Sequence, residues 1–145
     1  MISTTQKRDE FCVSLRVFGD DIDLSEVTRL LNCEPTNSAR TGDIITSRNG
    51  YSRTVRKGHW HLSSEPNALD LDERVIELLA KVSSDLDMWR ALTQRFDVDV
   101  FCGVFPAKEM HGFELSPRLL AMLAARKLPI VFDIYAPSPA IKGEA

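Results

Sequence analysis

The sequence has no long hydrophobic run and contains few cysteines. No apolar stretch approaches the roughly 20 residues that span a bilayer, and the first ten residues are polar and charged. Neither a transmembrane helix nor a secretory signal is therefore expected. The 3 cysteines show no C-x-x-C spacing, which favours buried, reduced thiols over a disulfide framework. We accordingly expect a cytoplasmic protein that does not bind a membrane.

Glycine is also sparse, with 7 residues in the whole chain. The intervals between Gly42, Gly50 and Gly58 fit neither G-x-G-x-x-G nor G-x-x-x-x-G-K-[ST], the two loops that commonly hold nucleotide phosphates. A nucleotide-dependent enzyme is therefore not expected.

The 3 histidines allow two arrangements with possible chemistry, and both are weak. His59 and His61 lie two residues apart on a predicted strand, so their imidazoles share one face and could join His111 in a zinc site. No carboxylate stands nearby at ligand spacing, which favours a partner contact instead. Cys102 could use His111 as a base, but Cys102 alternates with valines and is expected in the core, where a thiolate is disfavoured. We predict no catalytic residue, metal or cofactor.

The formal net charge is -3, which argues against a general nucleic-acid-binding protein, but the charge is distributed unevenly. Residues 36–57 carry five basic side chains against a single acid, Asp43. The basic residues are Arg40, Arg48, Arg53, Arg56 and Lys57. This stretch could contact an anion or a nucleic acid, although Asp99 and Asp133 elsewhere on the predicted sheet would repel a phosphate backbone.

Hydrophobic periodicity predicts alternating strands and helices along most of the chain. Strands are expected at 11–18, 58–64, 97–105 and 130–136, and helices at 24–31, 71–82, 85–96 and 116–127. Residues 36–57 contain turn formers and predict a long, mobile loop with a brief strand at 44–46. The helix at 116–127 is the clearest of these elements, because Ser116 can cap it and Pro117 suits its first position.

The length of 145 residues indicates one domain, which we place at residues 1–136, followed by a flexible tail at 137–145. A weak internal repeat relates residues 13–31 to residues 98–123, since each runs from a strand through a glycine to a helix. Two strand–helix–strand halves of this kind predict an α+β fold of ferredoxin-like type, with duplicated βαβ halves as one form of it and helices packed on one face of the sheet.

Strand alternation predicts which side chains occupy the sheet face opposite the helices. The expected residues are Ser14, Arg16, Asp99, Phe101, Phe105, Asp133 and Tyr135. Aromatic groups interleaved with both signs of charge are typical of a protein–protein contact surface. The alternative is that residues 85–96 or the long loop cover this face. Trp60 lies opposite the two histidines on its strand and is expected in the core.

Several short strings resemble the bacterial family called domain of unknown function 4279. They include Leu-Arg-Val-Phe-Gly-Asp at 15–20, Glu-Pro-Thr at 34–36, Gly-Asp at 42–43, Gly-His-Trp-His-Leu-Ser-Ser at 58–64, Phe-Cys-Gly at 101–103, Gly-Phe-Glu-Leu-Ser-Pro at 112–117 and Asp-Ile-Tyr at 133–135. The resemblance covers nearly the whole chain and implies a small stand-alone bacterial protein, with no established activity to transfer.

We therefore expect a non-enzymatic protein-binding module, comparable to toxin-neutralising immunity proteins, that binds another protein or a second copy of itself. The alternative is nucleic-acid or anion binding through the basic residues 40–57. The candidate binding residues are Arg16, Asp99, Phe101, Asp133, Tyr135, Arg40, Arg53, Arg56, His59 and His61.

Overall fold

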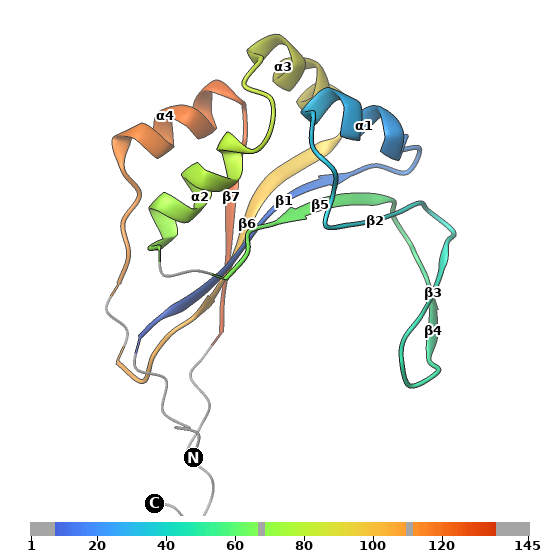
Figure 1. Cartoon of the computed structure of the whole chain (residues 1–145), viewed down its shortest axis with the longest axis horizontal. Helices are drawn as coiled ribbons and strands as arrows, with labels where there is room; N and C mark the ends of the chain where they lie inside the picture. Colours follow the sequence, from blue (N-terminus) through green and yellow to red (C-terminus); the bar gives the residue numbers. More distant parts are fainter. Residues whose placement is uncertain (1–7, 67–68, 110–111, 136–145) are drawn as a thin grey trace, which may run out of the picture.

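The computed structural model describes residues 8–66, 69–109 and 112–135, in which it places four helices and two sheets (Figure 1). The strands are β1 (Glu10–Phe18), β2 (Asn37–Ala39), β3 (Ile44–Thr46), β4 (Ser52–Thr54), β5 (His59–Ser63), β6 (Asp97–Phe105) and β7 (Ile130–Ile134). The helices are α1 (Leu24–Leu31), α2 (Leu71–Ala80), α3 (Leu86–Arg95) and α4 (Pro117–Ala125). The expected α+β class is confirmed, and the expected tail at 137–145 lies outside the described residues.

The main sheet has five strands in the order β2-β5-β1-β6-β7, and β3 and β4 form a separate two-stranded hairpin. β1 pairs antiparallel with both β5 and β6, whereas β6 and β7 pair in parallel through the crossover helix α4. The first half is split, because β5 lies between β1 and β2. The two halves thus differ in topology, and the ferredoxin-like arrangement is not confirmed.

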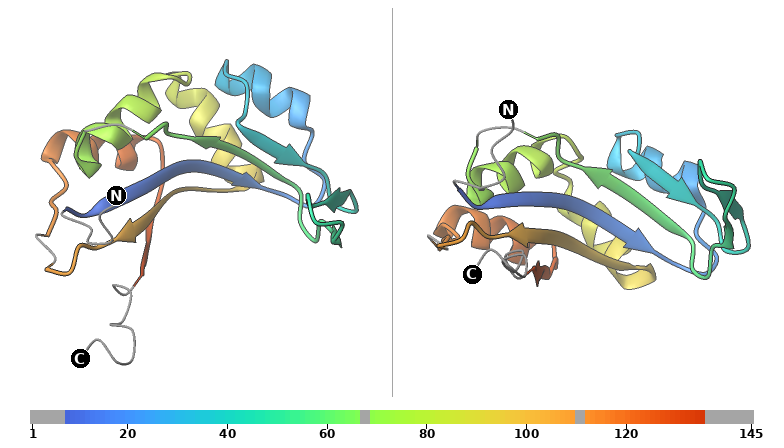
Figure 2. Two further views of the ribbon diagram at one scale, coloured as in Figure 1. Left: turned by 60° about the horizontal axis from the view of Figure 1, so that its bottom comes forward. Right: turned by 90° about the horizontal axis from the view of Figure 1, so that it is seen from below.

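All four helices lie on one side of the main sheet (Figures 1 and 2). The core between the two layers contains the inward row of β1, namely Val13, Leu15 and Val17, together with the fully buried Trp60 and Trp89. Alternation in β1 explains this row, since every second side chain of a strand points to the same face. The prediction that Trp60 lies in the core is confirmed.

Three helices begin at capping residues: Asp23 and Asp70 each precede a glutamate by three positions, the spacing of a capping box, and Ser116 is the cap that the sequence predicts. The side chains of Asp23, Asp70 and Ser116 each accept a hydrogen bond from the backbone N–H three residues later, at 3.2, 2.9 and 3.1 Å. Such caps satisfy amide groups that lack a partner in the first helical turn. The last helix ends at Ala125, two residues before the predicted end, and Lys127 adopts a left-handed conformation with φ of 58°.

The predicted long loop contains more regular structure than expected. The strand at 44–46 is confirmed as β3, which pairs with β4, and β2 adds an edge to the main sheet. Gly58 anchors the returning chain, because its carbonyl accepts from the Gly19 amide at 3.0 Å and its own amide donates to Thr41 at 2.9 Å. A Cβ at Gly58 would lie 2.8 Å from the Gly19 oxygen, so a side chain does not fit there.

Two expectations about burial are wrong. Cys12 is exposed and Cys33 is half-buried, so only Cys102 fits the expectation of a buried thiol. Cys12 lies on the sheet face that carries no helix, at the outer end of β1. Alternation along β7 predicts that Ile134 lies beneath α4 on the same face as Ile130, but 55% of it is exposed because β7 extends beyond the core.

Candidate functional site

The sheet face opposite the helices, which we call the open face, is the leading candidate for a binding surface. No helix of the described residues covers it, and the β3–β4 hairpin projects away from the helices at one end of the sheet (Figure 1). Helix α3 lies with the other helices, so the alternative in which residues 85–96 cover this face is wrong. Side chains on the open face include Arg16, Phe18, His59, His61, Asp99, Phe101, Phe105, Val131, Asp133 and Tyr135.

An ion pair between neighbouring strands forms the centre of the open face. Arg16 and Asp99 are directly opposite in the β1–β6 register, and the guanidinium donates through Nε and Nη2 to the two carboxylate oxygens at 2.8 and 2.7 Å. The guanidinium also lies 4.4 Å from the ring centre of Phe101 and 5.1 Å from that of Phe18. Two hydrogen bonds and two rings therefore hold Arg16 in one orientation.

Both candidate histidines lie on the same face, beside this ion pair. His61 is opposite Arg16 in the β1–β5 register, and its ring centre lies 5.3 Å from that of Phe18 and 4.5 Å from that of His59. Burial, followed by the charges of His59 and Arg16, lowers the pKa of His61 to about 4. The imidazole of His61 is therefore neutral at pH 7. Its Nε2 atom is buried and has no hydrogen-bond partner among the described residues.

A second aromatic group lies at the far edge of the open face. The rings of Phe105 and Tyr135 stack at 4.7 Å with an angle of 4° between their planes. A hydrogen bond to Asp133 raises the pKa of the Tyr135 hydroxyl. Tyr135 and Asp133 are both exposed, so this end of the face presents an aromatic ring beside a carboxylate.

The basic residues that the sequence singled out lie on the hairpin and in the segments beside it. A shallow pocket of about 580 Å³ is lined by Arg53, Thr54, Val55, Arg56, Lys57 and His59. Lys57 pairs with Asp97 at 3.0 Å, whereas no ion pair found within the described residues involves Arg53 or Arg56. Arg40 is exposed but does not line this pocket. Because His59 belongs both to the pocket and to the open face, the two surfaces are continuous.

The predicted site residues therefore fall into three groups. The structure brings Arg16, Asp99 and Phe101 together with both histidines, and it places Asp133 with Tyr135 at one end and the arginines at the other. Sequence reasoning treated the histidines apart from the sheet face and missed Phe18. Alternation along β1 would have found Phe18, since it follows Arg16 by two residues.

The alternative chemistry of the cysteine and histidines gains little support. Cys102 is fully buried, and burial followed by the charge of Asp99 raises the pKa of its thiol to about 12. A thiol in this state is a poor nucleophile at neutral pH. His111 lies outside the described residues. Within the described ranges, no group of three or more His, Cys, Asp or Glu side chains could hold a metal ion.

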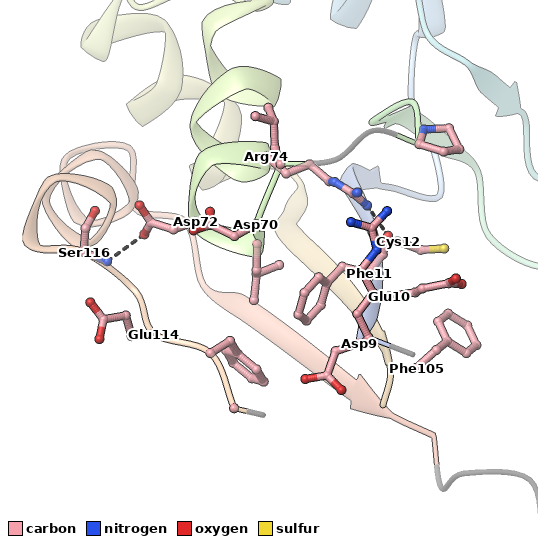
Figure 3. A pocket seen from close by; sticks show the side chains of 16 residues that line it. Asp9, Glu10, Phe11, Cys12, Asp70, Asp72, Arg74, Phe105, Glu114 and Ser116 are labelled. Atoms are coloured by element: carbon pink, nitrogen blue, oxygen red, sulfur yellow. Dashed lines mark hydrogen bonds between the residues drawn. The ribbon is translucent and has the colours of Figure 1, made fainter. Parts of the chain in front are cut away.

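Sequence reasoning also missed a larger cavity, of about 780 Å³, where the start of β1 meets the first turn of α2 and the segment that leads into α4 (Figure 3). Its carboxylates include Asp9, Asp70 and Asp72, and each accepts a backbone N–H, from Ala107, Glu73 and Ser116 respectively. Arg74 donates to the carbonyl oxygen of Phe11 across the same region. These polar groups join three segments that are far apart in the sequence, and no local motif marks them.

The fold and the open face define a small α+β protein with a sheet covered on one side. Residues 9–137 match the family described as Domain of unknown function (DUF4279), and the chain belongs to that family. No curated protein and no solved structure matches the chain. Among the described residues, no helix is long and apolar enough to cross a membrane.

Proposed function

We propose that this chain is a non-enzymatic bacterial protein of the cytoplasm that binds another protein through its open face, in the manner of an immunity protein. The observation that carries the proposal is the ordered group of Arg16, Asp99, Phe101 and His61 on a sheet face without a helical cover. Arginine and aromatic side chains provide a large share of the binding energy at protein interfaces.

The order of this group favours tight binding. Fixing a long, flexible side chain on association costs about 0.5–1.5 kcal/mol, and Arg16 is already held by Asp99 and by the two adjacent rings. Its charge is also balanced by Asp99, so a partner does not have to neutralise an isolated buried cation. A partner with apolar and hydrogen-bonding groups therefore suits the centre of the face, and the exposed Tyr135 can serve as an anchor at its edge.

The test begins with isolation of a partner from the native host and purification of both proteins. Titration calorimetry then compares the wild-type chain with Phe101→Ala and Tyr135→Ala. Leu86→Ala is the control, because Leu86 is an exposed apolar residue on α3, on the helical side. We expect each open-face substitution to weaken binding by roughly tenfold or more, as for an interface anchor, and the control to have no effect. Loss of binding only in Leu86→Ala would place the interface on the helices.

The second candidate function is binding of an anion or a nucleic acid at the pocket beside the hairpin. It is favoured by Arg53 and Arg56, which line this pocket and for which no ion pair is found among the described residues. Binding of this kind weakens steeply with salt, with a log–log slope of about 0.9 for each phosphate contact on duplex DNA. The same calorimetry with RNA and DNA over a range of salt concentrations tests this alternative. Salt-sensitive binding that is lost in the Arg53→Ala, Arg56→Ala double variant would favour it over protein binding.

A further inference from the structure

Strand β7 forms an outer edge of the main sheet, and its backbone leaves one set of polar groups unpaired with β6. On the side toward β6, the carbonyl oxygen of Pro129 accepts a hydrogen bond from the Val100 amide at 3.0 Å. The Tyr135 amide donates to the carbonyl oxygen of Val104 at 2.9 Å. In a parallel ladder, alternate residues of a strand bond to the same neighbour. The residues between them on β7, namely Ile130, Phe132 and Ile134, therefore direct their N–H and C=O groups away from β6.

This edge is also unusually apolar. Eight large hydrophobic side chains are exposed in the described part of the chain. Three of them lie on β7 or directly after it: Val131, Ile134 and Tyr135, which are 38, 55 and 44% exposed. A fourth, Phe113, packs on Phe132 at 5.2 Å between ring centres. Proteins usually protect an exposed strand edge with lysine, proline, a bulge or short length. The opposite edge, β2, has only 3 residues, whereas β7 has 5 and carries a single charge, Asp133.

We propose that β7 pairs antiparallel with β7 of a second copy of this chain, about a two-fold axis that passes through Phe132. An axis perpendicular to the sheet keeps the helices of both copies on the same side and joins the two sheets into one. Phe132 then faces Phe132 of the second copy as a hydrogen-bonded pair, and Ile130 faces Ile134. Every outward amide and carbonyl of the strand gains a partner in this register.

Charge selects this register over its neighbours. If one strand moves by one residue along the other, residues whose N–H and C=O groups point toward the second copy face residues whose groups point toward β6. Only shifts by two residues therefore preserve the hydrogen bonds between the two copies. One such shift places Asp133 directly opposite Asp133 of the second copy, where like charges repel. The opposite shift pairs only Ile130, Val131 and Phe132 with β7 of the second copy, and it leaves Asp133 and Ile134 opposite residues that precede the strand. The central register avoids both faults, since Asp133 lies opposite the uncharged Val131 and the other facing pairs are apolar.

The first experiment measures the mass of the full chain by sedimentation equilibrium. We expect a concentration-dependent species of twice the 16.3 kDa chain mass. Ile134→Lys should convert it to a monomer, because a lysine on a strand edge disfavours pairing with another chain. The matched control is Ile44→Lys, since Ile44 is 72% exposed on the hairpin strand β3. A wild-type chain that is monomeric at all concentrations would overturn the proposal, as would a dimer that Ile134→Lys leaves intact.

The second experiment tests the register by disulfide formation. Two proteins are prepared in a Cys12→Ser background, which removes the exposed native thiol, and they carry Val131→Cys or Asp133→Cys. The proposed register brings position 131 of one copy opposite position 133 of the other, within the roughly 4.4–6.8 Å between Cα atoms that a disulfide spans. We expect a cross-linked dimer in the mixture and much less in either protein alone. Cross-linking by one protein alone, at the level of the mixture, would overturn this register.

The dimer is independent of the proposed binding of another protein to the open face. The monomeric Ile134→Lys chain should still bind an isolated partner, whereas Phe101→Ala should weaken that binding and leave the dimer intact. Failure of the dimer would therefore not count against the proposed function, and failure of partner binding would not count against the dimer.

Discussion

Truncation of Trp60 tests the architecture that separates the core from the open face. Trp60 is fully buried on the helix-facing side of β5, between two histidines that point the other way. Its indole N–H donates to the hydroxyl of Thr28 on α1 at 3.0 Å. Trp60→Ala removes both the apolar packing beneath α1 and this hydrogen bond.

The expected loss is large compared with the stability of a domain of this size. Replacing a buried tryptophan by alanine costs about 3–5 kcal/mol, out of a total of roughly 5–15 kcal/mol for a typical domain. At about 2–4 °C for each kcal/mol in a chain of this size, the melting temperature should fall by roughly 6–20 °C.

Urea denaturation followed by circular dichroism measures the change, and an unchanged slope with denaturant would show that only stability has changed. Thr28→Val separates the two contributions, because it keeps the packing and leaves the indole N–H without its partner, at a cost of about 1–3 kcal/mol. Tyr135→Ala is the surface control and should leave the midpoint almost unchanged. A Trp60→Ala protein with the wild-type midpoint would refute the placement of the strand faces, and the contact surface would then have to be sought on the other side of β5.

Two further predictions concern groups that titrate. The pKa of His61 is lowered from 6.5 to about 4, so below pH 6.5 the unfolded chain binds a proton that the folded chain does not, and stability should fall as the pH drops toward 4. In urea denaturation, His61→Gln should reduce this fall of the midpoint with pH. A His61→Gln protein with the same pH profile as the wild type would contradict the prediction. A thiol reagent should label the exposed Cys12 in the native protein but Cys102 only after unfolding, because Cys102 is buried and its thiol pKa is raised to about 12; equal labelling of both under native conditions, measured by mass spectrometry, would contradict this.

Local patterns predicted most of the elements because they depend on neighbours in the sequence. The alternation in β1 and β6 and the caps at Asp23, Asp70 and Ser116 all act within a few residues, and the structure contains each of them. The short strands β2 and β4 escaped prediction because they are polar and 3 residues long. Backbone pairing forms them, of β2 with the distant β5 and of β4 with the neighbouring β3, and no side-chain pattern records that pairing.

The composition of the open face depends on the same long-range pairing. Each strand alone showed which side chains share a face, but the order of the strands decides which faces adjoin. Insertion of β5 between β1 and β2 brings His61 opposite Arg16, and β6 separates both from Asp133 on β7. The larger cavity is likewise assembled from segments that meet only in the fold. Neither feature could be predicted from residue spacing.

The position of His59 links the two candidate functions to a single surface. Its imidazole is almost fully buried, contacts His61 on the open face, and also lines the pocket with Arg53 and Arg56. A protein bound to the open face near His61 therefore lies beside two arginines for which no ion pair was found in the described ranges. Carboxylates on that part of the partner would be attracted to the arginines, and the attraction would weaken with salt. The basic hairpin can thus contribute to protein binding without any nucleic acid, and the sensitivity of partner binding to Arg56→Ala at low and high salt decides between a contributing and a separate site.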